Sequence, residues 1–273
     1  MLKYSVLISI YRKDNPDYFN LALESMTKQT VLPNEIVVVK DGKITDDLQN
    51  IIVKHKLLSK NIPFVEIHLK NNVGLGLALN EGIKACKYEL IARMDSDDYS
   101  LPNRCELQLK EFEKEPELDI IGTSVLEFVD NIENIVGKRD VPKTNEEIYK
   151  FARLRDPFNH PSVMYKKSTI LNVGGYSNYR KNQDTDLWIK LLQNNAKCKN
   201  LSEPLVLFRF DKNTYEKRKS FLSIKTLLKI RYKAWKTGFN SLFDFVLIVL
   251  SQLFIYALPD SFQKIIYRCF LRG

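Results

Sequence analysis

Asp95, Asp97 and Asp98 stand close together in IARMDSDDYSLP, the stretch from residue 91 to residue 102. An apolar run precedes them. Neighbouring carboxylates repel one another and lose hydration when they leave water, so this group at the mouth of a buried strand requires a compensating cation. A hard divalent ion such as Mg²⁺ or Mn²⁺ is usually held by one or two carboxylates and shared with substrate phosphates. The stretch is therefore a candidate site for such an ion.

The same stretch also has features of a capping turn and of a calcium loop. A solvated turn that caps a helix starting near Pro102 would favour Asp and Ser. A calcium loop would use Asp95, Asp97 and Glu106 as ligands, in the register of an EF-hand. That loop is rejected because Ser100 stands where its sharp turn requires glycine, and because Pro102 interrupts it. The capping turn stays open as an alternative to the metal site.

A second pair of acids, Asp184 and Asp186, stands at the start of a helical pattern in KNQDTDLWIKLL. Capping and the helix dipole explain one acid at a helix start. Two acids exceed what a cap needs. A carboxylate at a helix end that faces a pocket is the type of group that serves as a general base.

Two single residues have ordinary structural roles available to them. Asp41 precedes Gly42, and Asp-Gly is a common turn, although an acid at the end of a strand can also bind a nucleotide base or ribose. His160 in FNHPSV is a lone histidine, which is more often structural than catalytic.

The segment NNVGLGLALNEG contains Gly74 and Gly76 in a G-x-G pattern, but Leu79 occupies the third glycine position of a dinucleotide fingerprint. A dinucleotide site is not expected. Gly74 instead permits a tight turn between a strand and a helix, and Gly82 permits close packing of that helix.

Apolar, β-branched runs alternate with helical patterns in the first part of the chain. The alternation predicts βαβ units and a parallel sheet covered by helices on both faces, with ligands bound at the carboxyl ends of its strands. The predicted strands are 4–11, 35–42, 64–69 and 88–95, and the predicted helices are 17–29, 46–58 and 76–87.

The pattern changes after about residue 115, but no linker or repeat interrupts it. Residues 1–210 are therefore predicted to form one mixed α/β domain, followed by a helical tail over 211–273. In the later part of the domain, strands are predicted at 118–130, 161–167 and 204–210, and helices at 145–155 and 184–195.

Seven segments, taken in chain order, resemble the family 2 glycosyltransferases with the GT-A fold, particularly bacterial enzymes of capsule and O-antigen assembly. The resemblance covers roughly residues 3–210. Each segment alone is a weak signal, whereas the ordered set is specific. The segments are SVLISIYRKDNPDYFNLALESMTKQT, EIVVVKDG, NNVGLGLALNEGIKAC, IARMDSDDYSLPNR, NHPSVMYKKS, VGGY and QDTDLWIKLL.

The resemblance implies a Rossmann-like, mostly parallel sheet flanked by helices. It also implies inverting transfer of a hexose or N-acetylhexosamine from a UDP-sugar to a lipid-linked saccharide acceptor in surface polysaccharide synthesis, with Mn²⁺ or Mg²⁺ as cofactor. Asp97 is the stronger metal ligand, with Asp95 beside it, and Asp184 matches the catalytic base. The residues expected to contact the nucleotide sugar are Ser9, Tyr11, Asp41, Asn72, Asn80, Arg93 and Asp95.

Two positions depart from the pattern of this family. The family usually has Glu-Asp where this chain has Gln183-Asp184, which keeps the base but removes an acid with a possible role at the acceptor. The usual Asp-Gly-Ser is changed to Asp41-Gly42-Lys43, which alters local hydrogen bonding near the donor.

The formal excess of positive charge lies wholly in the last part of the chain. Residues 209–273 carry 13 Lys and Arg against four Asp and Glu, and the net charge of the whole chain is +9. Basic and apolar residues are interleaved over 221–236, and 241–259 is mostly apolar but marginal for the roughly 20 residues that span a bilayer.

Basic helices with apolar faces lie on anionic membrane surfaces, so the tail is expected to associate with the cytoplasmic leaflet. A helical subdomain that packs on the core or forms an oligomer is the alternative. Nucleic-acid binding is not expected, because no nucleic-acid-binding module accompanies the charge.

The expected location is the cytoplasm, peripheral to the inner face of the membrane. The first residues, MLKYSVLISIY, lack the charged lead and cleavage site of a signal peptide. No C-x-x-C pair occurs among the cysteines, which argues against a zinc site or a disulfide framework and fits a reducing compartment. The cysteines are Cys86, Cys105, Cys198 and Cys269.

Two rival function classes remain. A non-catalytic nucleotide-sugar-binding or membrane-docked scaffold could keep the same fold, but it would have no use for a base such as Asp184. A nucleotidyltransferase would carry a Gly-rich phosphate loop after the first strand, and SIYRKDNP contains no glycine.

Overall fold

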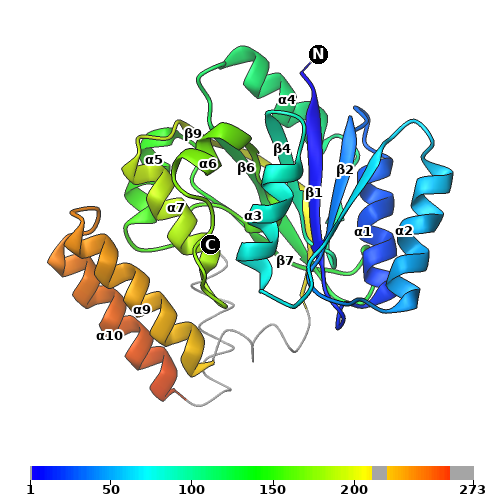
Figure 1. Cartoon of the computed structure of the whole chain (residues 1–273). Helices are drawn as coiled ribbons and strands as arrows, with labels where there is room; N and C mark the ends of the chain where they lie inside the picture. Colours follow the sequence, from blue (N-terminus) through cyan, green and yellow to red (C-terminus); the bar gives the residue numbers. More distant parts are fainter. Residues whose placement is uncertain (1, 211–219, 259–273) are drawn as a thin grey trace.

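The computed structural model describes residues 2–210 and 220–258. Within these ranges, one nine-stranded sheet forms the centre of the molecule. Its strand order is β3-β2-β1-β4-β8-β6-β9-β5, and β7 pairs with β6 beside this path. Helices lie on both faces of the sheet, and a helical hairpin lies to one side of it (Figure 1).

The first half of the domain is a run of βαβ units, as the sequence predicts. The strands β1, β2, β3 and β4 are mutually parallel where they pair. Their bounds and those of the intervening helices agree with the predicted ranges to within about two residues. They are β1 (Tyr4–Ile10), α1 (Pro16–Thr27), β2 (Glu35–Lys40), α2 (Asp46–Leu58), β3 (Phe64–His68), α3 (Leu75–Ala85) and β4 (Leu90–Met94).

The side chains of β1 point alternately into two hydrophobic cores. Val6 and Ile8 pack with residues of α1 and α2 on one face, whereas Leu7 packs with residues of α3 on the other. The sequence of a parallel strand covered on both faces is almost continuously apolar, because its side chains alternate between two buried surfaces.

In the second half, the strand direction is mixed. The short strand β8 is antiparallel to both β4 and β6, while β9 is parallel to β6 and antiparallel to β5. The elements are β5 (Tyr99–Ser100), α4 (Arg104–Lys114), β6 (Ile120–Phe128), β7 (Ile135–Arg139), α5 (Asn145–Ala152), η1 (His160–Ser162), β8 (Met164–Lys166), α6 (Lys167–Asn172), α7 (Gln183–Gln193) and β9 (Cys198–Arg209).

Three short elements, β5, β7 and α6, have no counterpart among the predicted ranges, and β9 begins six residues before the predicted 204. The strand β5 has two residues, and β7 pairs only with β6 and is largely exposed. Segments this short or this exposed carry no clear apolar period, so their pairing depends on the neighbouring strand.

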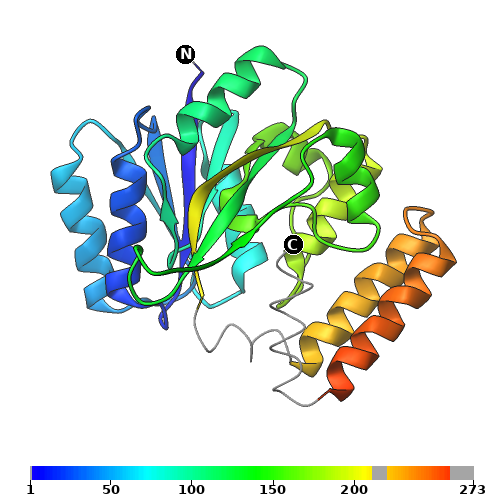
Figure 2. The same ribbon diagram turned by 180° about the vertical axis from the view of Figure 1, so that it is seen from behind.

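The helical hairpin consists of α9 (Phe221–Lys236) and α10 (Leu242–Ala257), and Figure 2 shows it beside the α/β domain from behind. Ile230 and Ala234 of α9 pack against Ile189 of α7. Arg153 forms an ion pair with Asp244 of α10 at 2.6 Å. Among the described residues, no helix has both the length and the apolar character needed to span a bilayer.

Gly82 of α3 packs directly on the sheet, as the sequence suggested. A Cβ atom built there would overlap Leu7 and lie 2.7 Å from Val39 Cγ2. Gly82→Ala is therefore expected to lower the free energy of unfolding by about 1–3 kcal/mol, in spite of the better helix propensity of alanine. Urea unfolding measures this change. Leu7→Ala removes the overlapping methyl groups. If the double variant lost as much free energy of unfolding as the sum of the two single variants, this steric origin would be contradicted.

Candidate active site

A cleft of about 550 Å³ lies at the carboxyl ends of β1, β2 and β4. The carboxyl ends of parallel strands share one edge of a sheet, so residues far apart in the sequence meet there. The cleft is lined by most of the predicted site residues, namely Ser9, Tyr11, Asp41, Asn72, Asp95, Asp97 and Asp184. An adjoining hollow of about 500 Å³ shares Tyr11, Asp41 and Asn72 and adds Arg12, Lys13, Lys43 and Lys70.

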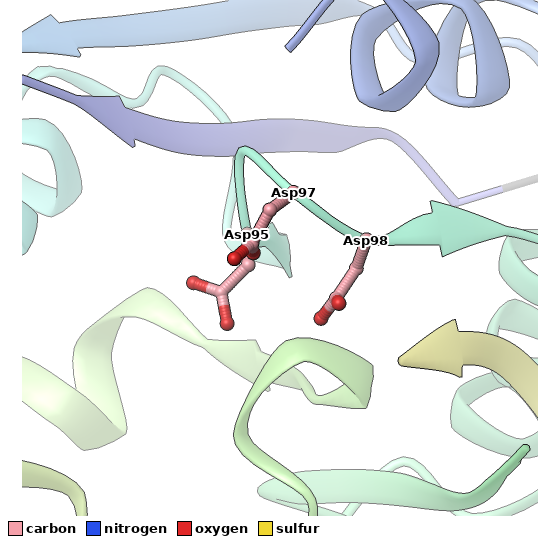
Figure 3. Close-up of side chains that lie close together, drawn as sticks. All are labelled: Asp95, Asp97 and Asp98. Atoms are coloured by element: carbon pink, nitrogen blue, oxygen red, sulfur yellow. The ribbon is translucent and has the colours of Figure 1, made fainter. Parts of the chain in front are cut away.

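The turn between β4 and β5 carries the three-aspartate group, Asp95, Asp97 and Asp98, as Figure 3 shows. One oxygen from each carboxylate lies within 4.8 Å of the others. The carboxylate of Asp95 accepts hydrogen bonds from both terminal nitrogens of the buried Arg93, and Nη1 lies 2.9 Å from Oδ2. The guanidinium therefore offsets part of the negative charge of the group and fixes the orientation of Asp95.

Arg209 of β9 holds the other side of this turn. Its backbone N–H donates to Asp98 Oδ1 at 2.8 Å, and its Nε donates to the carbonyl oxygen of Asp97 at 2.9 Å. The guanidinium lies over the ring of Tyr18, 3.6 Å from the centroid. These contacts fix the backbone of the turn, while the side chain of Asp97 is exposed to the cleft.

The donor set of the three-aspartate group suits a hard divalent cation. Asp98 is fully buried, and within the described residues its Oδ2 has no hydrogen-bond partner. Burial raises the pKa of Asp98 well above its ordinary value, and the charges of Asp97 and Asp95 raise it further. A buried acceptor without a partner, beside two more carboxylates, fits a site that a metal ion would complete.

Asp41 and Asn72 also line the cleft. The carboxylate of Asp41 accepts hydrogen bonds from the backbone N–H groups of Val73 at 2.6 Å and Gly74 at 2.9 Å, and from Asn72 Nδ2 at 2.9 Å. Arg180 Nη1 donates to Asn72 Oδ1 at 2.8 Å. Asp41 therefore anchors the loop before α3, and Arg180 joins that loop to the segment before α7.

The structure separates the two acids of α7. Asp186 points away from the cleft, where it accepts from Ser177 Oγ at 2.6 Å and pairs with Lys190 at 2.9 Å. Asp184 lines the cleft. Burial raises the pKa of Asp184 to about 6, and the negative charge of Asp156 contributes to the increase. A carboxylate with this pKa is ionised at neutral pH and more basic than an ordinary aspartate, as a general base requires.

Two of the predicted nucleotide contacts, Asn80 and Arg93, do not line the cleft. Asn80 pairs with the backbone of Tyr176 through both ends of its amide, each at 2.8 Å, and so joins α3 to the loop after α6. Arg93 is 1% exposed and reaches the cleft only through Asp95. His160 also lies apart from the cleft lining, where its Nε2 contacts Tyr176 Oη at 2.8 Å, which agrees with a structural histidine.

Several cleft residues were not identified from the sequence. They are Asp14, Tyr18, Arg180, Lys181, Asn182, Arg209 and Ser223. Arg180, Lys181 and Asn182 belong to the loop SNYRKNQ, residues 177–183, which leads into α7. Arg209 and Ser223 lie near the start of the basic tail. In the sequence this region was interpreted through its net charge, and neither residue was connected with the cleft.

Comparison with known proteins agrees with the resemblance seen in the sequence. The model of the glycosyl transferase family 2 matches residues 5–188. A UDP-Gal:alpha-D-GlcNAc-diphosphoundecaprenol beta-1,3-galactosyltransferase of Escherichia coli is 36% identical over 270 residues, which cover 99% of this chain and 97% of that protein. The amylovoran biosynthesis glycosyltransferase AmsE of Erwinia amylovora is 34% identical, with 86% and 88% covered.

Solved structures confirm the predicted GT-A fold. The 1–349 fragment of S. aureus TarS aligns with a TM-score of 0.65 at 19% identity, over 96% of this chain and 74% of that one. The mannosyltransferase PcManGT of Pyrobaculum calidifontis, in complex with GDP-Man and Mn²⁺, gives a TM-score of 0.65 at 15% identity, with 93% and 70% covered. The matches in sequence and in fold agree, and this chain therefore belongs to glycosyl transferase family 2 and is a glycosyltransferase.

Proposed function

We propose that this glycosyltransferase transfers a hexose or N-acetylhexosamine from a UDP-sugar to a lipid-linked saccharide in the synthesis of a surface polysaccharide. The observation that carries the proposal is one cleft lined by Asp184 and by Asp95 and Asp97 of the three-aspartate group. The name of the Escherichia coli relative supports the substrate class, since it specifies a UDP-sugar donor and a diphosphoundecaprenol-linked acceptor. UDP-galactose is accordingly the first donor to test.

The donor would lie along this cleft and the adjoining hollow. Ser9, Tyr11 and Asp41 line the part where the nucleoside would bind, together with the basic residues of the adjoining hollow. Asp97 and Asp95 would hold Mn²⁺ or Mg²⁺ beside the diphosphate. When bound, such an ion supplies Lewis-acid stabilisation of the negative charge that develops on the leaving diphosphate.

Asp184 would act on the acceptor. Its ionised carboxylate takes the proton from the attacking hydroxyl group of the saccharide as the bond from that oxygen to the anomeric carbon forms. The bond from the anomeric carbon to the diphosphate oxygen breaks on the opposite side, so the configuration inverts in one displacement. No covalent enzyme intermediate is required, because the acceptor oxygen itself is the nucleophile.

Calorimetric titration with UDP, GDP, CDP and dTDP, each with Mn²⁺ and again with EDTA, tests the donor class. We expect UDP to bind selectively and only when the metal is present, because the diphosphate and the aspartates share the ion. Transfer from UDP-galactose to a GlcNAc-diphosphate lipid then tests the reaction. If no nucleotide bound to the folded protein, a non-catalytic scaffold would become the better assignment.

We also propose that residues 1–210 form the catalytic domain and that residues 211–273 attach it to the cytoplasmic leaflet of the membrane. In the described part of the tail, large apolar side chains of α10 are exposed, while α9 carries basic residues. The exposed apolar residues of α10 include Leu242, Phe243, Val246, Leu247, Leu250, Leu253 and Phe254. The exposed basic residues of α9 are Lys225, Lys229, Lys233 and Lys236. Apolar insertion beside cationic groups suits an anionic bilayer.

Replacing both Phe243 and Phe254 by Ser is expected to weaken binding to vesicles of phosphatidylglycerol and phosphatidylethanolamine by about tenfold or more. Their side chains are 75% and 62% exposed, and burial of a phenylalanine contributes about 1.5–3 kcal/mol. Cosedimentation measures the change. Leu58→Ser, on α2, removes an equally exposed apolar side chain and serves as the control. Equal vesicle binding by the double variant and the wild type would contradict this attachment.

A further inference from the structure

Helix α9 reaches the start of the catalytic helix α7 through Ser223. Asn182 directly precedes α7 and has a left-handed backbone conformation, with φ of 55°. Instead of capping its own helix, its side-chain Nδ2 donates to the carbonyl oxygen of Ser223 at 2.7 Å and lies 3.3 Å from Ser223 Oγ. Both residues line the cleft beside Asp184. Ser223 of the tail therefore lines the cleft next to Asn182, the residue directly before α7.

A second chain of contacts joins α9 to the residue after the base. Arg231 of α9 is 2% exposed, and its Nη1 donates to the carbonyl oxygen of Ala152 at 2.6 Å. Its Nη2 lies 3.7 Å from Asp156 Oδ1. The other oxygen of Asp156 accepts from Thr185 Oγ1 at 3.0 Å. Asp184 is thus bracketed, with Asn182 before it and Thr185 after it both connected to α9.

The same contacts control the charge around Asp184. After burial, the carboxylate of Asp156 is the main cause of the raised pKa of Asp184, and the guanidinium of Arg93 acts in the opposite direction. Arg231 lies on the far side of Asp156 and offsets its charge. The other titratable and charged groups that line the cleft with Asp184 are Tyr11, Asp14, Tyr18, Asp41, Asp95, Asp97, Arg180, Lys181 and Arg209, and Tyr176 lies near Asp184 from the loop after α6.

We propose that α9 is a positioning element for the catalytic base, and that it acts through Ser223 on Asn182 and through Arg231 and Asp156 on Thr185. The inference rests on the proposed role of Asp184 and assigns these residues to the geometry and charge of that side chain. A helix that docks the protein on a membrane is thereby also part of the site that receives the membrane-linked acceptor.

A second hydrogen bond associated with α7 and α9 serves as a control for the contact at Asn182. Gln193 Nε2 donates to Thr237 Oγ1 at 2.6 Å, at the end of α7 remote from the base. If α9 only anchored the hairpin, loss of this hydrogen bond and loss of the one at Asn182 would have similar consequences. If α9 positions the base, only the contact at Asn182 should affect catalysis.

Asn182→Gly tests the first connection, because glycine keeps the left-handed backbone and removes the amide. We expect kcat to fall by about tenfold, as a misplaced reacting group does, with UDP affinity within about twofold of the wild type. Thr237→Val should leave both values unchanged. The same kcat for the two variants would overturn the proposal.

Asp156→Asn and Arg231→Gln test the second connection through the acid limb of the pH profile of kcat/KM. Without the charge of Asp156, the ionised form of Asp184 is favoured, so the limb should move to lower pH. Without Arg231, the charge of Asp156 is no longer offset, so the limb should move to higher pH. An unmoved limb in Asp156→Asn would overturn the proposal, and this variant suffices if the buried Arg231→Gln does not fold.

Carbon-13 NMR of the labelled aspartate carboxyls distinguishes failure of this inference from failure of the proposed reaction. The resonance lost in Asp184→Asn identifies the base, and its titration is then followed in Asp156→Asn. A pKa that moves downward supports the positioning network even if the chosen donor and acceptor give no transfer. A resonance that titrates as in the wild type refutes the network whatever the reaction is.

Discussion

Asp184→Asn is expected to lower kcat by about 10²- to 10⁴-fold while metal-dependent binding of UDP stays within about twofold of the wild type. General-base catalysis supplies a rate factor of this size, and asparagine keeps the shape of the side chain without accepting the proton. Asp184 lines the cleft but lies on α7, apart from the turn that carries the three aspartates. The substitution should therefore separate catalysis from donor binding. Near-normal turnover of this variant would show that another group is the base.

The pH dependence of the wild type should carry the signature of the same residue. Because burial raises the pKa of Asp184 to about 6, the fraction of ionised base falls as the pH drops through 6. The rate should decrease in that range and be nearly constant at neutral pH. Asp186→Asn changes the neighbouring acid of the same helix, which contacts Ser177 and Lys190 instead of the cleft, and should leave the acid limb in place.

Asp97→Ala is expected to weaken metal-dependent UDP binding by about 100-fold, equivalent to about 2.7 kcal/mol, because it removes a ligand on which the ion and the diphosphate both depend. Asp97 is the appropriate target within the three-aspartate group. Arg93 already engages Asp95, and Asp98 is buried, whereas the carboxylate of Asp97 is exposed to the cleft.

The decisive measurement for Asp97 is the UDP affinity with Mn²⁺ against the affinity with EDTA. In the wild type the two affinities should differ widely, and in Asp97→Ala they should nearly coincide. Asp47→Ala removes an exposed acid from the first turn of α2, away from the cleft, and should keep the full metal effect. A metal effect of wild-type size in Asp97→Ala would exclude this residue as an essential ligand.

The core of the α/β domain could be predicted from the sequence because its signals are local and repeated. A buried parallel strand such as β1 is almost entirely apolar, and α2 carries Thr45 as an N-cap followed by two acids. The strand β7 could not be predicted in this way. It is largely exposed, and its position is set by its pairing with β6 rather than by its own pattern.

Cleft residues could be named from the sequence where they stand together in one short motif, and were missed where distant segments supply them. Asp95 and Asp97 stand two residues apart, so the sequence identifies them as candidate cation ligands, with a capping turn as the alternative. Arg209 holds the same turn from β9, more than 110 residues away in sequence, through a backbone hydrogen bond to Asp98 and a side-chain bond to the carbonyl of Asp97. A backbone donor has no signature in the residue type, because every residue except proline has the same N–H group.

The sequence by itself determined the chemistry available to this protein: its carboxylates, their order along the chain, and the apolar strands that precede them. Only the tertiary structure decided which of those groups act together. It turned Asp184 toward the cleft and Asp186 toward Lys190, and it placed Arg93 behind Asp95 and α9 beside α7. The physical reason is that distance and burial set the charge and reach of an ionisable group, and both arise only when segments far apart in sequence pack together.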